Sequence, residues 1–325
     1  MTLFLMRRTL QGAITIFVMS VIVFVGVYAI GNPVDILINP DATPEIKQQA
    51  IERLGLDKPI LEQYGTFVVR ALQGDLGNSF IYGEPALQLI LKAMPATLEL
   101  ALMSMLMALV LGIPLGMIAG YWPNSTASNV IMTGSIFGFS LPSFWVGLML
   151  ILIFSVTMGW LPSGGRGDTV DLLGVEVSFL TWDGLKHLFL PALNLALFKI
   201  SLVIRLTRAG MKETMQQDYI KYARAKGLAG SRVVFVHAFR NTLIPLVTVL
   251  GLEMGSVIAF AVVTETVFSW PGMGKLIIDS INLLDRPVIV AYLMLTVLMF
   301  VVINLVVDIT YSAIDPRVRL SETSD

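Results

Sequence analysis

The chain has 325 residues, of which 55% are hydrophobic and only 14% are charged, with a formal net charge of −1. Soluble domains usually contain about 25% charged residues, so this composition places most of the chain in a membrane. The near-zero net charge gives no field that would attract nucleic acid. The absence of cysteine excludes disulfides and thiolate metal sites, and two distant histidines do not suggest a metal site.

Six stretches are long and apolar enough to cross a bilayer, which takes about 20 residues in a helix. The sequence therefore predicts an all-α membrane protein with six transmembrane helices. The predicted spans are residues 9–30, 97–121, 131–159, 188–208, 245–268 and 288–312. The first span follows two arginines and is longer than the apolar core of a signal peptide, so we interpret it as a retained span.

The distribution of basic residues predicts the orientation of the spans. Arg7 and Arg8 precede the first span, a basic loop at 209–244 follows the fourth, and Arg317 and Arg319 follow the sixth. With six spans these regions share one side, so both termini and the loop are expected to be cytoplasmic. Three segments are then expected outside: 31–96, 160–187 and 269–287.

The chain thus divides into three predicted regions. Residues 1–30 hold the cytoplasmic N-terminus and the first span, and residues 31–96 form an outer segment. Within that segment, Thr43 and Pro44 resemble a helix start, and a second amphipathic pattern runs from about Lys58 to Gln73. Residues 97–325 form the remaining transmembrane core.

Glycines recur every four residues in the second predicted span, at Gly112, Gly116 and Gly120, and the third span adds Gly134 and Gly138. Small residues at this spacing allow helix backbones to approach closely in lipid. We interpret them as packing positions; lining of a pore is the alternative.

Lys199 and Glu253 are ionisable residues that lie deep inside predicted spans, where charge is costly and often functional. Lys199 lies about nine residues from the inner end of the fourth span, and Glu253 about eight from that of the fifth. Their matched depth and opposite charge predict an ion pair. The alternatives are that each faces a watery pathway separately, or that Lys199 extends toward the interface.

The basic loop contains residues typical of the starts and ends of two short helices. Asp218 is a candidate N-cap for a helix that Gly227 ends, and a second helix is predicted over Ser231–Thr242, with Pro245 opening the fifth span. We call residues 218–230 the elbow. Its candidate docking residues for a soluble partner are Asp218, Tyr219, Tyr222, Ala223, Arg224, Ala225, Lys226 and Gly227. A loop that only contacts anionic lipid is the alternative.

No catalytic constellation accompanies these features. The stretch Pro271–Lys275 lacks the spacing and the Ser or Thr of a phosphate-binding loop, and no complete nucleotide-binding motif of that kind occurs elsewhere. We therefore expect an outer turn there, no catalytic residues, and no cofactor or metal bound by this chain.

Residues Asp218–Leu228, together with His237–Pro245, resemble the coupling loop of dipeptide/oligopeptide ABC importer permeases. Similarity to this family extends over nearly the whole chain. It includes the segments Leu54–Pro59, Gln63–Tyr64, Gly74–Ser79, Pro95–Leu100, Thr264–Gly272 and Asp315–Arg319. One departure is that the general importer motif begins Glu-Ala-Ala, whereas this chain has Lys221-Tyr222-Ala223.

The resemblance implies an inner-membrane subunit with the type I ABC importer fold. The implied partners are a second, related permease, two ATPase subunits that hold ATP and Mg²⁺, a periplasmic or lipid-anchored substrate-binding protein, and membrane lipid. The implied cargo is a di- or oligopeptide; nickel chelates, glutathione and oligosaccharides remain alternatives. A self-sufficient secondary transporter or a passive channel is a different class, for which the sequence shows neither paired broken helices nor a selectivity filter.

Overall fold

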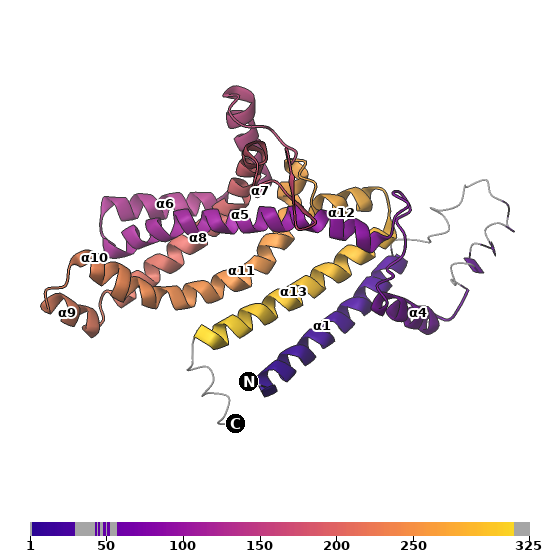
Figure 1. Ribbon diagram of the computed structural model, residues 1–325, viewed down its shortest axis with the longest axis horizontal. Helices are drawn as coiled ribbons and strands as arrows, with labels where there is room; N and C mark the ends of the chain where they lie inside the picture. Colours follow the sequence, from indigo (N-terminus) through magenta and orange to yellow (C-terminus); the bar gives the residue numbers. More distant parts are fainter. Residues whose placement is uncertain are drawn as a thin grey trace. The chain divides into compact units, whose positions relative to one another are not determined.

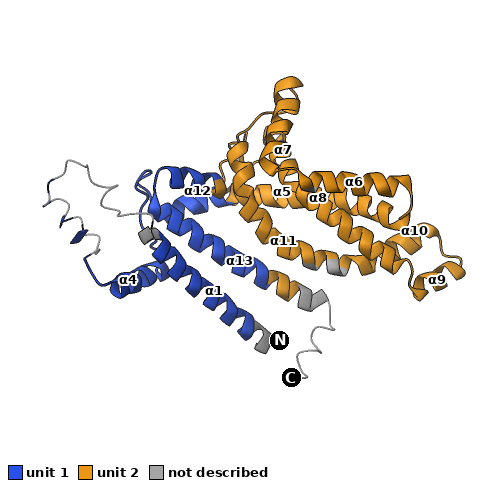
Figure 2. Cartoon of the chain, turned by 180° about the vertical axis from the view of Figure 1, so that it is seen from behind, with its two compact units in different colours: residues 1–94, 275–305 blue, residues 95–274, 306–325 orange. Residues whose placement is uncertain are grey.

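The computed structural model describes residues 2–29, 43, 45, 48–49, 51–52 and 57–314. These residues are predominantly helical, and the chain divides into two compact units (Figures 1 and 2). Unit 1 comprises residues 1–94 and 275–305, and unit 2 comprises residues 95–274 and 306–325. Most of the predicted outer helix that begins at Thr43 lies outside the described residues.

Unit 1 contains the first predicted span as α1 (Thr2–Ala29) and most of the last as α13 (Arg286–Ile314). The two helices approach closely at Gly12, where an added Cβ would lie 2.6 Å from Val301 Cγ1. The outer-segment helix α4 (Ile60–Leu72) confirms the amphipathic pattern predicted from Lys58 to Gln73. It is tied to α1 by a 2.8 Å hydrogen bond between the hydroxyls of Ser20 and Tyr64.

Unit 2 is built around α5 (Ala86–Tyr121), α8 (Trp182–Thr214) and α11 (Phe239–Val267), which contain the second, fourth and fifth predicted spans. All three are long enough and apolar enough to cross a membrane, as are α1 and α13. Pro95, Pro114 and Pro191 lie inside these helices without ending them. In membrane helices, neighbouring helices and local backbone adjustments satisfy the polar groups that a proline frees.

The third predicted span is not one continuous helix. It divides into α6 (Thr126–Ser140) and α7 (Ser143–Leu150), which continues into the π-helix η1 (Ile151–Thr157). The two halves are bent by 103° at the break. Pro142 explains the break, because proline disfavours helical backbone at the preceding residue, and Leu141 is extended with ψ of 138°.

Two elements of the segments expected to face outward have no counterpart among the predicted ones. A two-stranded antiparallel hairpin pairs β1 (Val170–Leu172) with β2 (Val175–Val177) through a turn at Leu173 and Gly174, both with positive φ. A short helix, α12 (Met273–Asn282), follows the predicted outer turn at Pro271. Helix thus accounts for the spans, and the hairpin is a small addition to an all-α fold.

The glycines of α5 pack as predicted. Cβ atoms added at Gly112, Gly116 and Gly120 would each lie within 2.7 Å of a side-chain atom of α8, and within 3.3 Å of an α8 carbonyl oxygen. The two backbones are therefore nearly in contact along three turns. Gly134 in α6 differs, because nothing lies within 4 Å of its added Cβ.

Candidate functional site

The elbow begins where α8 ends, with the short helix α9 (Asp218–Ala225). Its N-cap is Gln217, which makes no side-chain capping bond, so the prediction that Asp218 caps this helix is wrong by one residue. Asp218 occupies the first helical position instead and accepts a 2.8 Å hydrogen bond from Lys221 Nζ. That bond lowers the pKa of the Asp218 carboxyl, and both side chains are exposed.

The end of α9 lies where the sequence predicts it. Lys226 is the C-cap, and Gly227 follows with φ of +74°, the left-handed conformation that glycine adopts without steric cost. The amide of Gly227 donates to the carbonyl of Arg224 at 2.9 Å. No atom of the described residues lies within 4 Å of a Cβ added at Gly227, so glycine is required by the backbone conformation and not by lack of space.

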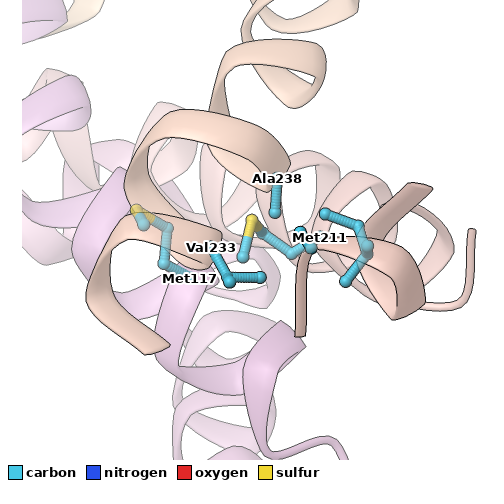
Figure 3. Packing of buried hydrophobic residues seen from close by; sticks show 6 residues of the cluster. Met117, Met211, Val233 and Ala238 are labelled. Atoms are coloured by element: carbon cyan, nitrogen blue, oxygen red, sulfur yellow. The ribbon is translucent and has the colours of Figure 1, made fainter. Parts of the chain in front are cut away.

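One face of α9 is held against the rest of unit 2. Ile220 and Ala223 are buried in an apolar cluster, shown in Figure 3, that also includes Met117 of α5, Met211 of α8, and Val233 and Ala238. The assignment of Ala223 to the docking face is therefore wrong. Apolar side chains three residues apart select the inward face of a two-turn helix, and Ala223 positions the elbow from inside.

The opposite face of α9 is open. Tyr219 and Tyr222 are 42% and 62% exposed, and Lys226 Nζ lies 4.6 Å from the centre of the Tyr222 ring. Tyr219 Oη accepts a 2.6 Å hydrogen bond from Asn241 Nδ2 at the start of α11. Arg224 and Ala225 are also exposed. The elbow therefore presents aromatic and cationic side chains on an apolar anchor.

The second predicted helix of the loop is not a separate element. Helical structure starts at α10 (Gly230–Arg232), continues through the π-helix η2 (Val233–Ala238) and passes directly into α11. Pro245 lies within α11 and does not open it. The elbow is thus joined to the fifth predicted span by unbroken helix.

The structure brings Lys199 and Glu253 together. Lys199 Nζ on α8 forms an ion pair with Glu253 Oε2 on α11 and donates to Ser256 Oγ at 2.7 Å. The Lys199 side chain is 7% exposed and that of Glu253 is 30% exposed. The pair lies along these two helices and not in the elbow.

A direct test of this pair is a double-mutant cycle on uptake by the importer that the sequence resemblance implies. Lys199→Ala and Glu253→Ala are each expected to reduce uptake, because each leaves an uncompensated charge within a span. When each loss of uptake is expressed as a free energy, the loss in the double variant should be clearly smaller than the sum of the losses in the two single variants. Additive losses would show that the two side chains act separately.

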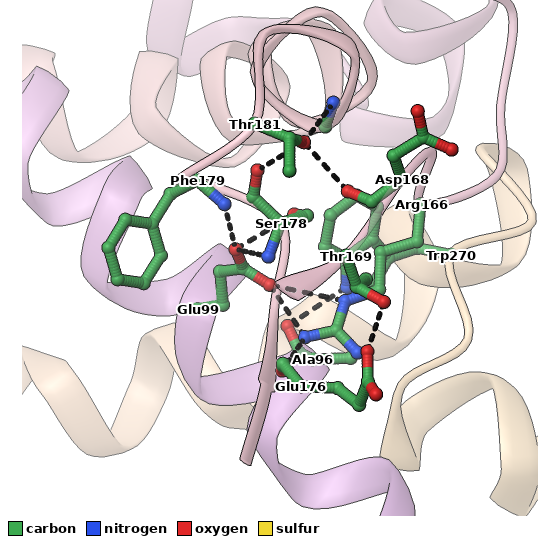
Figure 4. Close-up of polar contacts among 11 residues, drawn as sticks. Ala96, Glu99, Arg166, Asp168, Thr169, Glu176, Ser178, Phe179, Thr181 and Trp270 are labelled. Carbon is green, nitrogen blue, oxygen red and sulfur yellow. Dashed lines mark hydrogen bonds and ion pairs between the residues drawn. The ribbon is translucent and has the colours of Figure 1, made fainter. Parts of the chain in front are cut away.

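Sequence reasoning missed a buried polar cluster around Glu99 of α5 (Figure 4). Glu99 Oε1 accepts hydrogen bonds from the amides of Ser178 and Phe179, both at 2.7 Å, and from Ser178 Oγ at 2.8 Å. Glu99 Oε2 pairs with Arg166 Nη2 at 2.8 Å, and Arg166 also donates to the carbonyl of Glu176 at 2.6 Å. The cluster attaches the hairpin segment to α5.

Glu265, near the end of α11, is fully buried. Its carboxylate accepts a 2.7 Å hydrogen bond from Thr97 Oγ1 and lies against Gly272, where an added Cβ would overlap the carboxylate oxygens. Trp270 donates from its indole nitrogen to the Ala96 carbonyl at 2.9 Å. The signal in the sequence was a single acid in an apolar run, whose partner lies far away along the chain.

Comparison with known proteins gives this architecture its context. Residues 112–320 match the family described as binding-protein-dependent transport system inner membrane component, and residues 1–101 match the N-terminal family of the same membrane components. The chain belongs to this family. It is therefore a membrane subunit of a binding-protein-dependent transporter.

Two relatives extend over nearly the full chain. A di/tripeptide transport system permease protein of Pseudomonas aeruginosa is 42% identical over 89% of this chain and 90% of its own length. A glutathione transport system permease protein of Escherichia coli is 37% identical over 97% of this chain and 98% of its own. An inward-facing methionine ABC transporter chain shares the fold, with a TM-score of 0.53, 15% identity, and coverage of 70% of this chain and 97% of that one.

Proposed function

We propose that this chain imports short peptides as the permease subunit of an ATP-driven transporter in the inner membrane. The observation that carries the proposal is the structure of the elbow. One face of α9 exposes aromatic and cationic side chains, and the opposite face is buried in an apolar cluster. The helical segment that follows the elbow continues into α11. The similar permeases named for di/tripeptides and for glutathione, itself a tripeptide, support a small peptide as cargo.

The elbow and both termini then lie on the cytoplasmic side. The basic residues near the first and sixth spans and in the 209–244 loop support this orientation, because Lys and Arg favour the inner side of a membrane. The segments 31–96, 160–187 and 269–287 would face outward. There they would receive a solute from a substrate-binding protein, either periplasmic or lipid-anchored.

The energy for transport would come from two separate ATPase subunits, which bind ATP and Mg²⁺. The exposed face of α9 docks on an ATPase, and movement of the ATPase is transmitted through the cluster around Ile220 and Ala223 to α8 and α11. A second, related permease completes the pathway, which opens alternately to each side. Nickel chelates and oligosaccharides remain alternative cargoes of the same machine.

The decisive experiment is purification followed by reconstitution. The chain, expressed with its candidate partners, should co-purify with an ATPase and a second permease, and vesicles holding the complex should take up a dipeptide only with ATP and the binding protein. Peptide uptake by this chain alone, without ATP, would instead establish a secondary transporter.

Replacing Gly227 tests the elbow itself. Gly227→Ala places a side chain on a left-handed backbone at a cost of about 1–2 kcal/mol, so α9 should end differently and uptake should fall. Gly227→Asn is the matched control, because asparagine tolerates this conformation and should retain more uptake than alanine. Equal uptake by alanine, asparagine and wild type would contradict a docking role for this turn.

Replacing Tyr222 separates coupling from folding. Its ring is largely exposed, so Tyr222→Ala should leave the thermal stability of the chain nearly unchanged. If Tyr222 contacts the ATPase, the stimulation of ATP hydrolysis by loaded binding protein should decrease severalfold. Phe17→Ala, at a 60% exposed aromatic side chain of α1 outside both the elbow and the segments expected to face outward, is the control and should leave stimulation intact.

A further inference from the structure

The ion pair between Lys199 and Glu253 has an unusual asymmetry for two charges inside apolar helices. Lys199 lies near the middle of the candidate span Trp182–Thr214, and Glu253 lies within the candidate span Val249–Val267. The lysine is nearly buried, whereas the carboxylate keeps 30% of its side-chain surface exposed. The glutamate is therefore the part of the pair that something outside unit 2 can reach.

The two oxygens of Glu253 differ in their partners. Oε2 faces both Lys199 Nζ and Ser256 Oγ, with the serine hydroxyl at 2.7 Å. Oε1 accepts no hydrogen bond from any residue that the structure describes. Lys199 and Ser256 thus hold the carboxylate in one orientation and leave one oxygen available.

An available carboxylate oxygen at this depth does not face lipid at low cost, because exposing charge to hydrocarbon costs several kcal/mol. Two other acids of unit 2 that lie inside apolar helices, Glu99 and Glu265, show the contrast. Glu99 is 6% exposed with five hydrogen bonds, and Glu265 is fully buried. The exposed face of Glu253 is therefore expected to meet water or a polar ligand.

We propose that Glu253 binds the α-ammonium group of a peptide as it crosses the membrane, with Lys199 and Ser256 as positioning residues. The inference rests on the proposed function and adds the part of the substrate that this chain recognises. Lys199 already balances the charge of Glu253, so the site is neutral before binding. A zwitterionic peptide is also neutral, so its binding does not change the net charge of the site.

A ligand-by-protein cycle tests this contact in vesicles holding the complete importer. Uptake of Ala-Phe and of N-acetyl-Ala-Phe is measured for wild type and for Glu253→Gln, each with saturating binding protein. Any preference of the binding protein for one of the two peptides affects wild type and Glu253→Gln equally. It therefore cancels when the ratio of the two uptake rates is compared between the two permeases. If Glu253 forms a charged hydrogen bond with the peptide, Glu253→Gln should reduce the uptake of Ala-Phe about tenfold and the uptake of the acetylated peptide much less.

Equal losses for the two peptides would overturn the site at Glu253 while leaving peptide import intact. Failure of the wild type to import either peptide would instead refute the proposed function. The comparison is made between complexes containing equal amounts of assembled permease, so a variant that fails to fold does not count as a loss of binding.

The absence of cysteine from the chain allows a second measurement. In Glu253→Cys, a water-soluble anionic methanethiosulfonate should modify the thiol and restore uptake, a cationic one should not restore it, and Ala-Phe should slow both reactions. Leu252→Cys, at the neighbouring 52% exposed position, is the control and should show no protection by peptide. If the thiol of Glu253→Cys does not react in an assembled importer, the second permease or lipid covers this position, which overturns the proposal.

Discussion

Glu99→Ala is expected to lower the free energy of unfolding by about 3–5 kcal/mol, the usual cost of removing one partner from a buried ion pair. The loss is large because Arg166, whose side chain is only 12% exposed, would keep its charge without the carboxylate. The amides of Ser178 and Phe179 would lose their acceptor as well. Unpaired buried donors cost free energy beyond the bond itself.

The measurement is chemical or thermal unfolding of the purified chain in detergent, compared with Glu84→Ala. Glu84 forms a pair with Lys92 at 2.6 Å, but those side chains are 46% and 65% exposed. Exposed pairs contribute about 0–1 kcal/mol, so the control should be nearly neutral. A similar small effect for both variants would contradict the structural role assigned to the Glu99 cluster.

The spans were predictable because each needs only a local signal, a sufficient run of apolar residues. Five of the six predicted spans lie in helices long enough to cross a membrane. The third passes the same test only as a bent pair of helices, because average hydropathy does not register a break at one proline. Residues 131–159 are apolar throughout, yet Pro142 separates α6 from α7.

The elbow shows how much of a short helix can be predicted from the sequence. Its end at Gly227 was predictable, since few residues other than glycine adopt that backbone conformation readily. The direction in which Ala223 points was not, because the sequence of the loop does not show which other helices will cover this short one. Its orientation depends on Met117 and Met211, which lie on other helices.

The polar contacts differ in whether the sequence allows their partners to be identified. Lys199 and Glu253 could be matched because both lie in spans, and the span boundaries fix their depths. Glu99 could not, since Ser178 and Phe179 reach it from a segment whose course the sequence does not fix. Glu265 and Thr97 both lie in helices, but threonine carries no charge that would mark it as the partner of an acid. An acid alone in an apolar run indicates a partner without identifying it.

Gly116→Ala is expected to destabilise the chain by about 1–3 kcal/mol, the usual cost of overpacking a tight contact. The added methyl group would lie 2.6 Å from Thr207 Cβ and 2.8 Å from the carbonyl oxygen of Ile204. A flexible side-chain end could move aside, but these atoms belong to, or lie next to, the backbone of α8. The two helices must therefore separate, which also weakens the contacts at Gly112 and Gly120.

Gly134→Ala is the matched control because it makes the same substitution at a helical glycine with nothing within 4 Å of the added atom. Alanine is favoured over glycine in a helix by about 1 kcal/mol, so this variant should be neutral or slightly more stable. Opposite signs in unfolding measurements would show that contact with α8, not the loss of glycine itself, determines the effect. Equal effects would contradict the close approach of α5 and α8.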